Sequence, residues 1–132
     1  MLRKMMRAKI HRATITGCNP DYVGSITIDA DLLRASGIRP NEAVLVLDVD
    51  NAARFETYVI RGEPGSGVIA INGAAARLVE VGHKVLVVCF GLLNEDELEM
   101  HEAKVVLVDD VNQVSEQLIY PSVVDPQPVS VS

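Results

Sequence analysis

Residues 82–90 read GHKVLVVCF, the most apolar stretch of the chain, and they favour a buried β-strand. The run is short, rich in β-branched residues and opened by a glycine, all of which favour a strand over a helix. Similar short stretches lie elsewhere in the chain, at residues 7–16 (RAKIHRATIT), 43–49 (AVLVLDV), 55–60 and 104–108. Many short strands at close spacing predict a mainly β protein, closed into a barrel rather than built from βαβ units.

Turns and two brief helices are predicted between these strands. Asp29 is a good N-cap for a helix that ends at Ser36, and Gly37 suits the left-handed residue that follows a helix. Residues 62–67 (GEPGSG) are rich in glycine but lack the Lys-Ser/Thr ending of a phosphate-binding loop. We interpret them as a hairpin turn. Asn72 is expected to cap a second helix of a single turn.

The composition indicates one compact domain with an aliphatic core. Of the 132 residues nearly half are apolar, but only 4% are aromatic and none is Trp. Residues 1–115 are predicted to form the domain, and residues 116–132, which contain three Pro and no apolar period, a mobile C-terminal tail. Residues 95–102 are interpreted as a charged, solvated connection.

Charge and hydropathy argue against several kinds of partner. The net charge of −6 disfavours binding to nucleic acid or anionic lipid. The longest apolar run, residues 85–93, is too short for a membrane span, which needs about 20 residues, and no signal peptide is recognisable. Cys18 and Cys89 form no disulfide framework, which indicates reduced thiols and a cytoplasmic location. The three histidines lack metal-ligand spacing, so no metal site is expected.

A Gly-Ser pair interrupts the strand that is predicted for residues 22–28 (YVGSITI). Glycine weakens a strand and usually marks a bulge or a place where another group approaches closely. On spacing alone, a β-bulge before the helix at Asp29 is the preferred interpretation.

The pair also belongs to a set of four short motifs in a fixed order. Lys9 and His11 come first, followed by residues 22–25 (YVGS), residues 54–58 (RFETY) and residues 72–76 (NGAAA). In these motifs and their order the chain resembles the aspartate 1-decarboxylases, which are self-processing enzymes that depend on a pyruvoyl group. The resemblance covers about residues 3–110 and leaves out the C-terminal part of the chain.

The resemblance implies a double-psi β-barrel that cleaves itself between Gly24 and Ser25. Ser25 would attack the carbonyl group of Gly24, whose lack of a Cβ permits a bent backbone. Elimination of the resulting ester would leave a β chain of residues 1–24 and an α chain that begins with a pyruvoyl group derived from Ser25. That group would form a Schiff base with L-aspartate and take up the electrons that CO₂ leaves behind. The product, β-alanine, would feed pantothenate and coenzyme A synthesis.

The resemblance also implies roles for other motif residues. Arg54 is expected to bind a substrate carboxylate through its planar guanidinium group, with Lys9 as a second positive charge. Tyr58 is expected to protonate the carbanion, and Thr57 to assist processing or to contact the substrate. Asn72 is expected to donate a hydrogen bond to the oxyanion that forms during cleavage.

The other motif residues are expected to surround the substrate. The backbone amides of Gly73, Ala74 and Ala75 suit a carboxylate, and Tyr22 and His11 are expected to line or orient the site. Without the resemblance, packing, helix capping or solvent exposure would explain each of these residues. A homotetramer with active sites at subunit boundaries is also implied, and the need for a maturation factor stays open.

Two other functions fit parts of the sequence. Residues 24–49, with a strand, a short helix, a turn and a strand, also resemble the unit of swapped-hairpin transcription regulators, which are dimeric DNA-binding barrels. The negative charge, the chain length and the motifs at Arg54 and Asn72 count against DNA binding. An inactive barrel that only binds a partner would share the fold but would not cleave itself.

Overall fold

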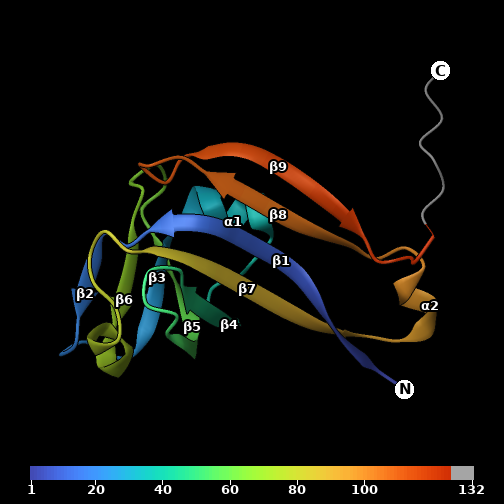
Figure 1. Ribbon diagram of the computed structural model, residues 1–132, viewed down its shortest axis with the longest axis horizontal. Coiled ribbons are helices and arrows are strands. Elements are labelled where there is room, and N and C mark those ends of the chain that lie inside the picture. Colours follow the sequence, from blue (N-terminus) through green and yellow to red (C-terminus); the bar gives the residue numbers. More distant parts are fainter. Residues whose placement is uncertain (126–132) are drawn as a thin grey trace.

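Nine strands form one curled, mixed β-sheet in the computed structural model, which describes residues 1–125 (Figure 1). The strands are β1 (Arg3–Thr14), β2 (Gly17–Asn19), β3 (Ser25–Asp29), β4 (Ala43–Asp48), β5 (Arg54–Gly62), β6 (Ile69–Asn72), β7 (Lys84–Leu93), β8 (Glu102–Val108) and β9 (Val114–Pro121). Two short α-helices, α1 (Ala30–Ser36) and α2 (Glu95–Leu98), and the 3-10 helix η1 (Gly73–Arg77) lie between them.

The strand order is β2-β6-β3-β5-β4-β7-β1-β8-β9. The pairs β1–β8, β2–β6 and β3–β5 are parallel, and the other pairs are antiparallel. Figure 1 shows the long strands β1, β7, β8 and β9 extending toward α2. The chain passes from β1 directly into β2, and the linking residues Ile15 and Thr16 bond to the backbone of His83 and Ile69. The sheet therefore curls on itself, which confirms a mainly β, barrel-like fold with short helices.

The core is aliphatic, as the composition predicts. Its largest fully buried side chains include those of Ile10, Ile26, Ile28, Ile69 and Ile71. Among the described residues, no aromatic side chain is fully buried in it. Strand β3 is buried along almost its whole length, with β5 and β6 paired on its two edges and α1 in contact with it. Ser25 at the start of β3 is therefore part of the buried core of the molecule.

Helix α1 begins and ends where the sequence predicts. The buried carboxylate of Asp29 accepts a hydrogen bond from the backbone N–H of Asp31 at 2.8 Å, and Gly37 follows the helix with a φ of 79°. The same carboxylate accepts bonds from the backbone N–H groups of Gly65 at 3.1 Å and Gly67 at 2.8 Å. Asp29 thus caps the helix and also holds the glycine-rich turn between β5 and β6.

Two local predictions need correction. The strand predicted for residues 22–28 begins only at Ser25, and residues 22–24 form an exposed turn before it. The connection predicted for residues 95–102 contains α2, which Asn94 and Glu97 stabilise through a reciprocal capping box. Among residues 1–125, no helix has the length and apolar character needed to cross a membrane.

The C-terminal tail predicted from residue 116 onward is wrong for residues 116–121, because Val114–Pro121 form β9. This strand pairs antiparallel with β8, with Leu118 opposite Val105. It lies at the edge of the sheet and most of its side chains are exposed. Main-chain hydrogen bonds to β8, rather than the burial of an apolar face, therefore hold this strand in place. Residues 126–132 of the predicted tail lie outside the described part of the chain.

Candidate active site

Ser25 at the start of β3 lies directly opposite Asn72 at the end of β6. Both residues are buried. The Asn72 Nδ2 atom donates to Ser25 Oγ at 2.9 Å and to the hydroxyl group of Thr27 at 3.2 Å. The Ser25 hydroxyl in turn donates to the carbonyl oxygen of Val23 at 3.3 Å. A buried hydroxyl group is thus held between a side-chain amide and the backbone just before it.

The side chain of Asn72 does not cap η1. Asn72 occupies the N-cap position in extended conformation, but its side chain makes no capping hydrogen bond. The predicted cap is therefore wrong, because the amide group turns toward Ser25 and Thr27 instead of toward the helix.

The turn that precedes Ser25 packs tightly against Gly73. The φ of Gly73 is 78°, and a Cβ at this position would lie 2.5 Å from the Cα of Gly24 and 3.3 Å from the carbonyl oxygen of Tyr22. Any other residue at position 73 would therefore push the turn away. A Cβ at Gly24 itself would meet no described atom within 4 Å outside its chain neighbours Val23 and Ser25, and Gly24 does not have a positive φ. The predicted reason for a glycine at position 24, which concerns attack by the neighbouring Ser25 on the Gly24 carbonyl, stays a prediction.

Tyr58 and Thr57 lie on β5, the parallel neighbour of β3. Ile26 is paired with Val59, so Ser25 at the start of β3 and Tyr58 in the middle of β5, each one residue earlier, lie side by side where the two strands begin to pair. The side chain of Tyr58 is exposed at this end, and Thr57 is partly buried. The structure therefore brings the predicted proton donor to the same region as Ser25.

Arg54 and Lys9 lie farther from Ser25 in the same chain. Arg54 is exposed at the start of β5, four residues before Tyr58, which corresponds to about 13 Å along a strand. Lys9 is in the middle of β1, and the strands β5, β4 and β7 lie between β1 and β3. Within residues 1–125, no hydrogen bond joins Arg54 or Lys9 to Ser25.

His11 and the alanines of η1 have different surroundings. The Nδ1 atom of His11 is buried and has no hydrogen-bond partner among residues 1–125. Burial, with the positive charges of Lys9 and Arg12, lowers the pKa of His11 below its usual value, so its imidazole ring is neutral near pH 7. Ala74 and Ala75 follow Gly73 in η1, beside the turn that contains Gly24.

Residues 1–115 match the family described as aspartate decarboxylase. The chain belongs to this family. An aspartate 1-decarboxylase of Bacillus cereus (strain B4264) is 56% identical over 118 residues, which cover 89% of this chain and 93% of the relative. Aspartate 1-decarboxylases of Bacillus thuringiensis (strain Al Hakam) and Bacillus anthracis (strain CDC 684 / NRRL 3495) are 55% identical over the same shares. The resemblance found in the four motifs is confirmed.

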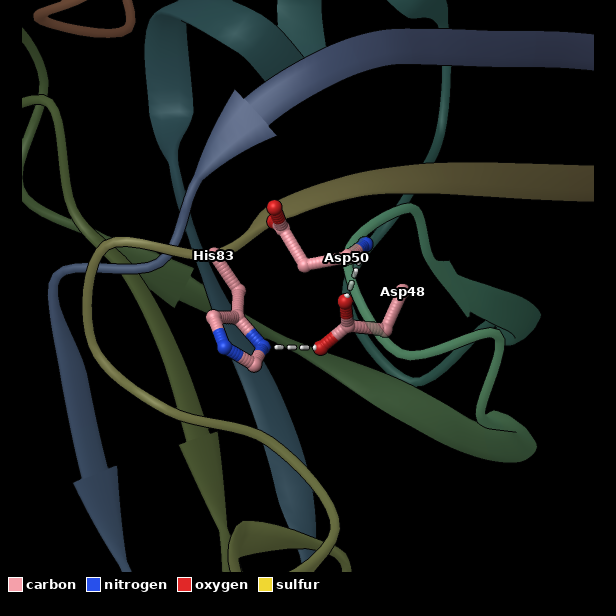
Figure 2. A group of neighbouring side chains, drawn as sticks. All are labelled: Asp48, Asp50 and His83. Carbon is pink, nitrogen blue, oxygen red and sulfur yellow. Dashed lines mark hydrogen bonds and ion pairs between the residues drawn. The ribbon is translucent and has the colours of Figure 1, made fainter.

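A cluster close to one family motif was not predicted from the sequence. Figure 2 shows Asp48, Asp50 and His83. One carboxylate oxygen from each aspartate and one imidazole nitrogen, atoms that could bind a metal ion, all lie within 4.8 Å of one another. The Nδ1 atom of His83 lies 2.6 Å from Asp48 Oδ2, and Asp48 Oδ1 accepts from the backbone N–H of Asp50 at 2.8 Å. Asp50 in turn accepts from the backbone N–H of Lys84 at 2.8 Å. These bonds join the turn before Arg54 to the start of β7, which explains the cluster as a structural connection of this decarboxylase.

The Asp48–His83 pair predicts that stability depends on pH. The hydrogen bond to Asp48 is the largest cause that raises the pKa of His83, and the negative charges of Asp48, Asp50 and Glu80 also raise it. The stabilisation is therefore complete below the unfolded pKa of about 6.5 and is lost as the pH rises through the higher folded pKa. In thermal unfolding, we expect the difference in Tm between the wild type and His83→Gln to shrink as the pH rises from the unfolded pKa of His83 through its higher folded pKa.

His101→Gln is the matched control, because His101 Nε2 contacts a backbone carbonyl oxygen, that of Met6, and not a carboxylate. Its difference in Tm from the wild type should not follow the same trend. Equal trends in the two variants would contradict the assignment to the Asp48–His83 pair.

Proposed function

We propose that the chain is the proenzyme of an aspartate 1-decarboxylase, which cleaves itself between Gly24 and Ser25 and then converts L-aspartate to β-alanine and CO₂. The observation that carries the proposal is the contact between Asn72 Nδ2 and Ser25 Oγ, next to the turn held by Gly73. β-Alanine from this reaction would supply pantothenate and hence coenzyme A synthesis. DNA binding is not favoured by any of these contacts.

Self-cleavage begins with the hydroxyl group of Ser25. Its oxygen attacks the carbonyl carbon of Gly24, the bond from that carbon to the Ser25 nitrogen breaks as the hydroxyl proton passes to that nitrogen, and the amide becomes an ester with a free amine. Loss of the α-proton of residue 25 then expels the carboxylate of Gly24, which ends the β chain. Hydrolysis of the remaining dehydroalanine releases ammonia and leaves a pyruvoyl group. The amide of Asn72 supports this sequence because it holds Oγ in place, and Asn72 is the proposed donor to the oxyanion on the Gly24 carbonyl.

The surroundings of Ser25 fit a pyruvoyl group. The position is buried, and the side-chain amide of Asn72 and the hydroxyl of Thr27 are polar partners beside it. When present, the group supplies an electron sink for the carbanion that remains after CO₂ leaves. The chain itself must bind the two carboxylates of L-aspartate, exclude water and deliver a proton.

Tyr58 is the residue proposed to deliver that proton. Its phenol lies at the same end of the β3–β5 pair as residue 25 and is exposed to solvent, from which it can be reprotonated. In Tyr58→Phe we expect complete self-cleavage but a kcat lower by about 10²–10⁴-fold, because general acid catalysis contributes that much. The measurement is the release of β-alanine from L-aspartate by the cleaved enzyme.

Thr57→Val is compared with Tyr58→Phe per cleaved chain, because Thr57 is expected to assist processing or to contact the substrate but is not the proposed proton donor. Its loss of kcat should be smaller. Wild-type protein that is fully cleaved but releases no β-alanine would contradict the proposed substrate.

The substrate carboxylates are proposed to be bound by Arg54 and Lys9 of a neighbouring subunit in a homotetramer. In one chain Arg54 lies about 13 Å along β5 from the level of Ser25, and L-aspartate has only four carbons. A subunit boundary would bring the cations of one chain to Ser25 of another. The free thiols of Cys18 and Cys89 agree with a cytoplasmic enzyme.

Co-expression of two inactive variants tests the shared site. Arg54→Ala keeps the cleavage motif and Ser25→Ala keeps the cation, so each is expected to be inactive alone. If each site takes Ser25 from one subunit and Arg54 from another, random mixing of equal amounts should restore about a quarter of the wild-type activity. About half of the subunits carry Ser25 and about half carry Arg54, so about one site in four has both residues. The readout is β-alanine released by the purified mixed enzyme.

Mixing the two variants after separate purification, without exchange of subunits, is the control and should restore no activity. Co-expression that also restores none would contradict the shared site while leaving the decarboxylase proposal intact.

A further inference from the structure

A pocket lies at the other end of the β3–β5 pair from Ser25. Arg61 on β5 is paired with Ile28 near the end of β3, next to the start of α1. The pocket lies between α1, the turn after it and Arg61, and it has a volume of about 340 Å³. Its lining consists of Ala30, Leu33, Arg34, Gly37, Ile38, Arg39, Pro40 and Arg61.

Three arginines from three elements surround this pocket, in a chain whose net charge is −6. Arg34 pairs with Asp31 at 2.7 Å. Within residues 1–125, neither Arg39 nor Arg61 forms an ion pair. Cations gathered at one cavity repel one another, so a bound anion would lower the electrostatic energy of this region.

The nearby carboxylate of Glu42 is already engaged. It accepts from Arg7 Nη2 at 2.6 Å and from the backbone N–H of Arg39 at 3.0 Å. Arg7 also donates to the carbonyl oxygen of Gly37 at 3.2 Å. These bonds fix the turn after α1 in place and leave the guanidinium group of Arg39 available. The wall of the pocket is therefore formed before any ligand arrives.

The floor of the pocket is apolar. Ala30, Leu33 and Ile38 are 3%, 6% and 2% exposed, and Pro40 adds a rigid apolar edge. A ligand for this site would combine an oxyanion, which guanidinium groups bind through paired N–H donors, with a small apolar body. The volume agrees with the lower end of small-molecule sites.

We propose that this pocket binds a small organic oxyanion, a phosphate monoester or a dicarboxylate, at a site separate from the one that contains Ser25. Arg39 and Arg61 bind the anionic group, and Leu33 and Ile38 contact the apolar part. The inference does not rest on the proposed decarboxylase function, because none of these residues belongs to the four family motifs.

Isothermal titration calorimetry on the full-length purified protein tests the proposal, with phenyl phosphate, inorganic phosphate and succinate as probes at fixed ionic strength. Phenyl phosphate is expected to bind saturably, once per chain, and more tightly than inorganic phosphate. The double variant Arg39→Ala/Arg61→Ala should weaken binding at least tenfold without changing decarboxylase activity. Succinate binding that is lost in the same variant would identify a dicarboxylate as the ligand.

Two controls separate charge, geometry and location. Arg39→Lys/Arg61→Lys keeps both positive charges but loses the planar guanidinium groups that bind an oxyanion through paired N–H donors. Its affinity for phenyl phosphate should lie between that of the wild type and that of the alanine variant. Arg3→Ala removes an exposed arginine that pairs with Glu95 elsewhere, and it should bind like the wild type. The proposal is wrong if no probe binds saturably or if the alanine variant binds the probes as tightly as the wild type does.

Discussion

A Ser25→Ala variant is expected to remain one intact chain of 14.3 kDa and to form no β-alanine. The methyl group has no lone pair with which to attack the Gly24 carbonyl, and Asn72 Nδ2 loses its acceptor at 2.9 Å. The wild-type chain is expected to separate into two fragments, which end at Gly24 and begin at residue 25. A denaturing intact-mass spectrum distinguishes these outcomes directly, and the larger wild-type fragment should carry the mass of a pyruvoyl N-terminus.

Thr27→Val is the matched control, because Thr27 Oγ1 accepts the second bond from Asn72, at 3.2 Å, but has no role in the attack. It should still be cleaved. Cleavage of Ser25→Ala at the same peptide bond would contradict the mechanism. A wild-type chain that stays whole after prolonged incubation would instead favour a required maturation factor, or an inactive barrel if activity is also absent.

Local chemistry made most of the strands and α1 predictable. β-Branched runs gave the strands near residues 43–49 and 82–90, and the Asp29 cap with Gly37 fixed both ends of α1. Strand β9 was missed because it is ordered by main-chain pairing with β8, which leaves little apolar pattern in the sequence. Helix α2 was missed because it is a single turn whose signal is the Asn94–Glu97 capping box within an acidic stretch.

The site was predictable as motifs but not as contacts. The family resemblance singled out Ser25 and Asn72, whereas their pairing depends on the register of β3 with β6. The His83–Asp48 bond joins residues 35 positions apart. The spacing of residues along the chain does not predict such contacts, because the contacts depend on how the strands are ordered and aligned. The same limit applies to Arg54, whose distance from Ser25 within one chain is visible only once β3 and β5 are aligned.

Gly73→Ala is expected to slow self-cleavage roughly 100-fold, because a shift of about 1 Å in a reacting group can have an effect of that size. The new Cβ would lie 2.5 Å from the Cα and 2.9 Å from the nitrogen of Gly24, and real Cβ atoms do not approach so closely. Both neighbouring atoms belong to the backbone, so the turn that carries the scissile bond must move. The rate is measured as the fraction of cleaved chain over time by intact mass.

The positive φ of Gly73 must be separated from its contact with Gly24, because alanine is strained at such a φ wherever it occurs. Gly82→Ala makes this separation, since Gly82 has a φ of 95° but a Cβ there would meet no described atom within 4 Å. Both variants should lose stability in thermal unfolding, and only Gly73→Ala should lose cleavage. If Gly73→Ala folds and is cleaved at the wild-type rate, the contact with Gly24 does not position the scissile bond. Equal slowing in both variants would assign the effect to backbone strain, because strain is the feature that the two positions share.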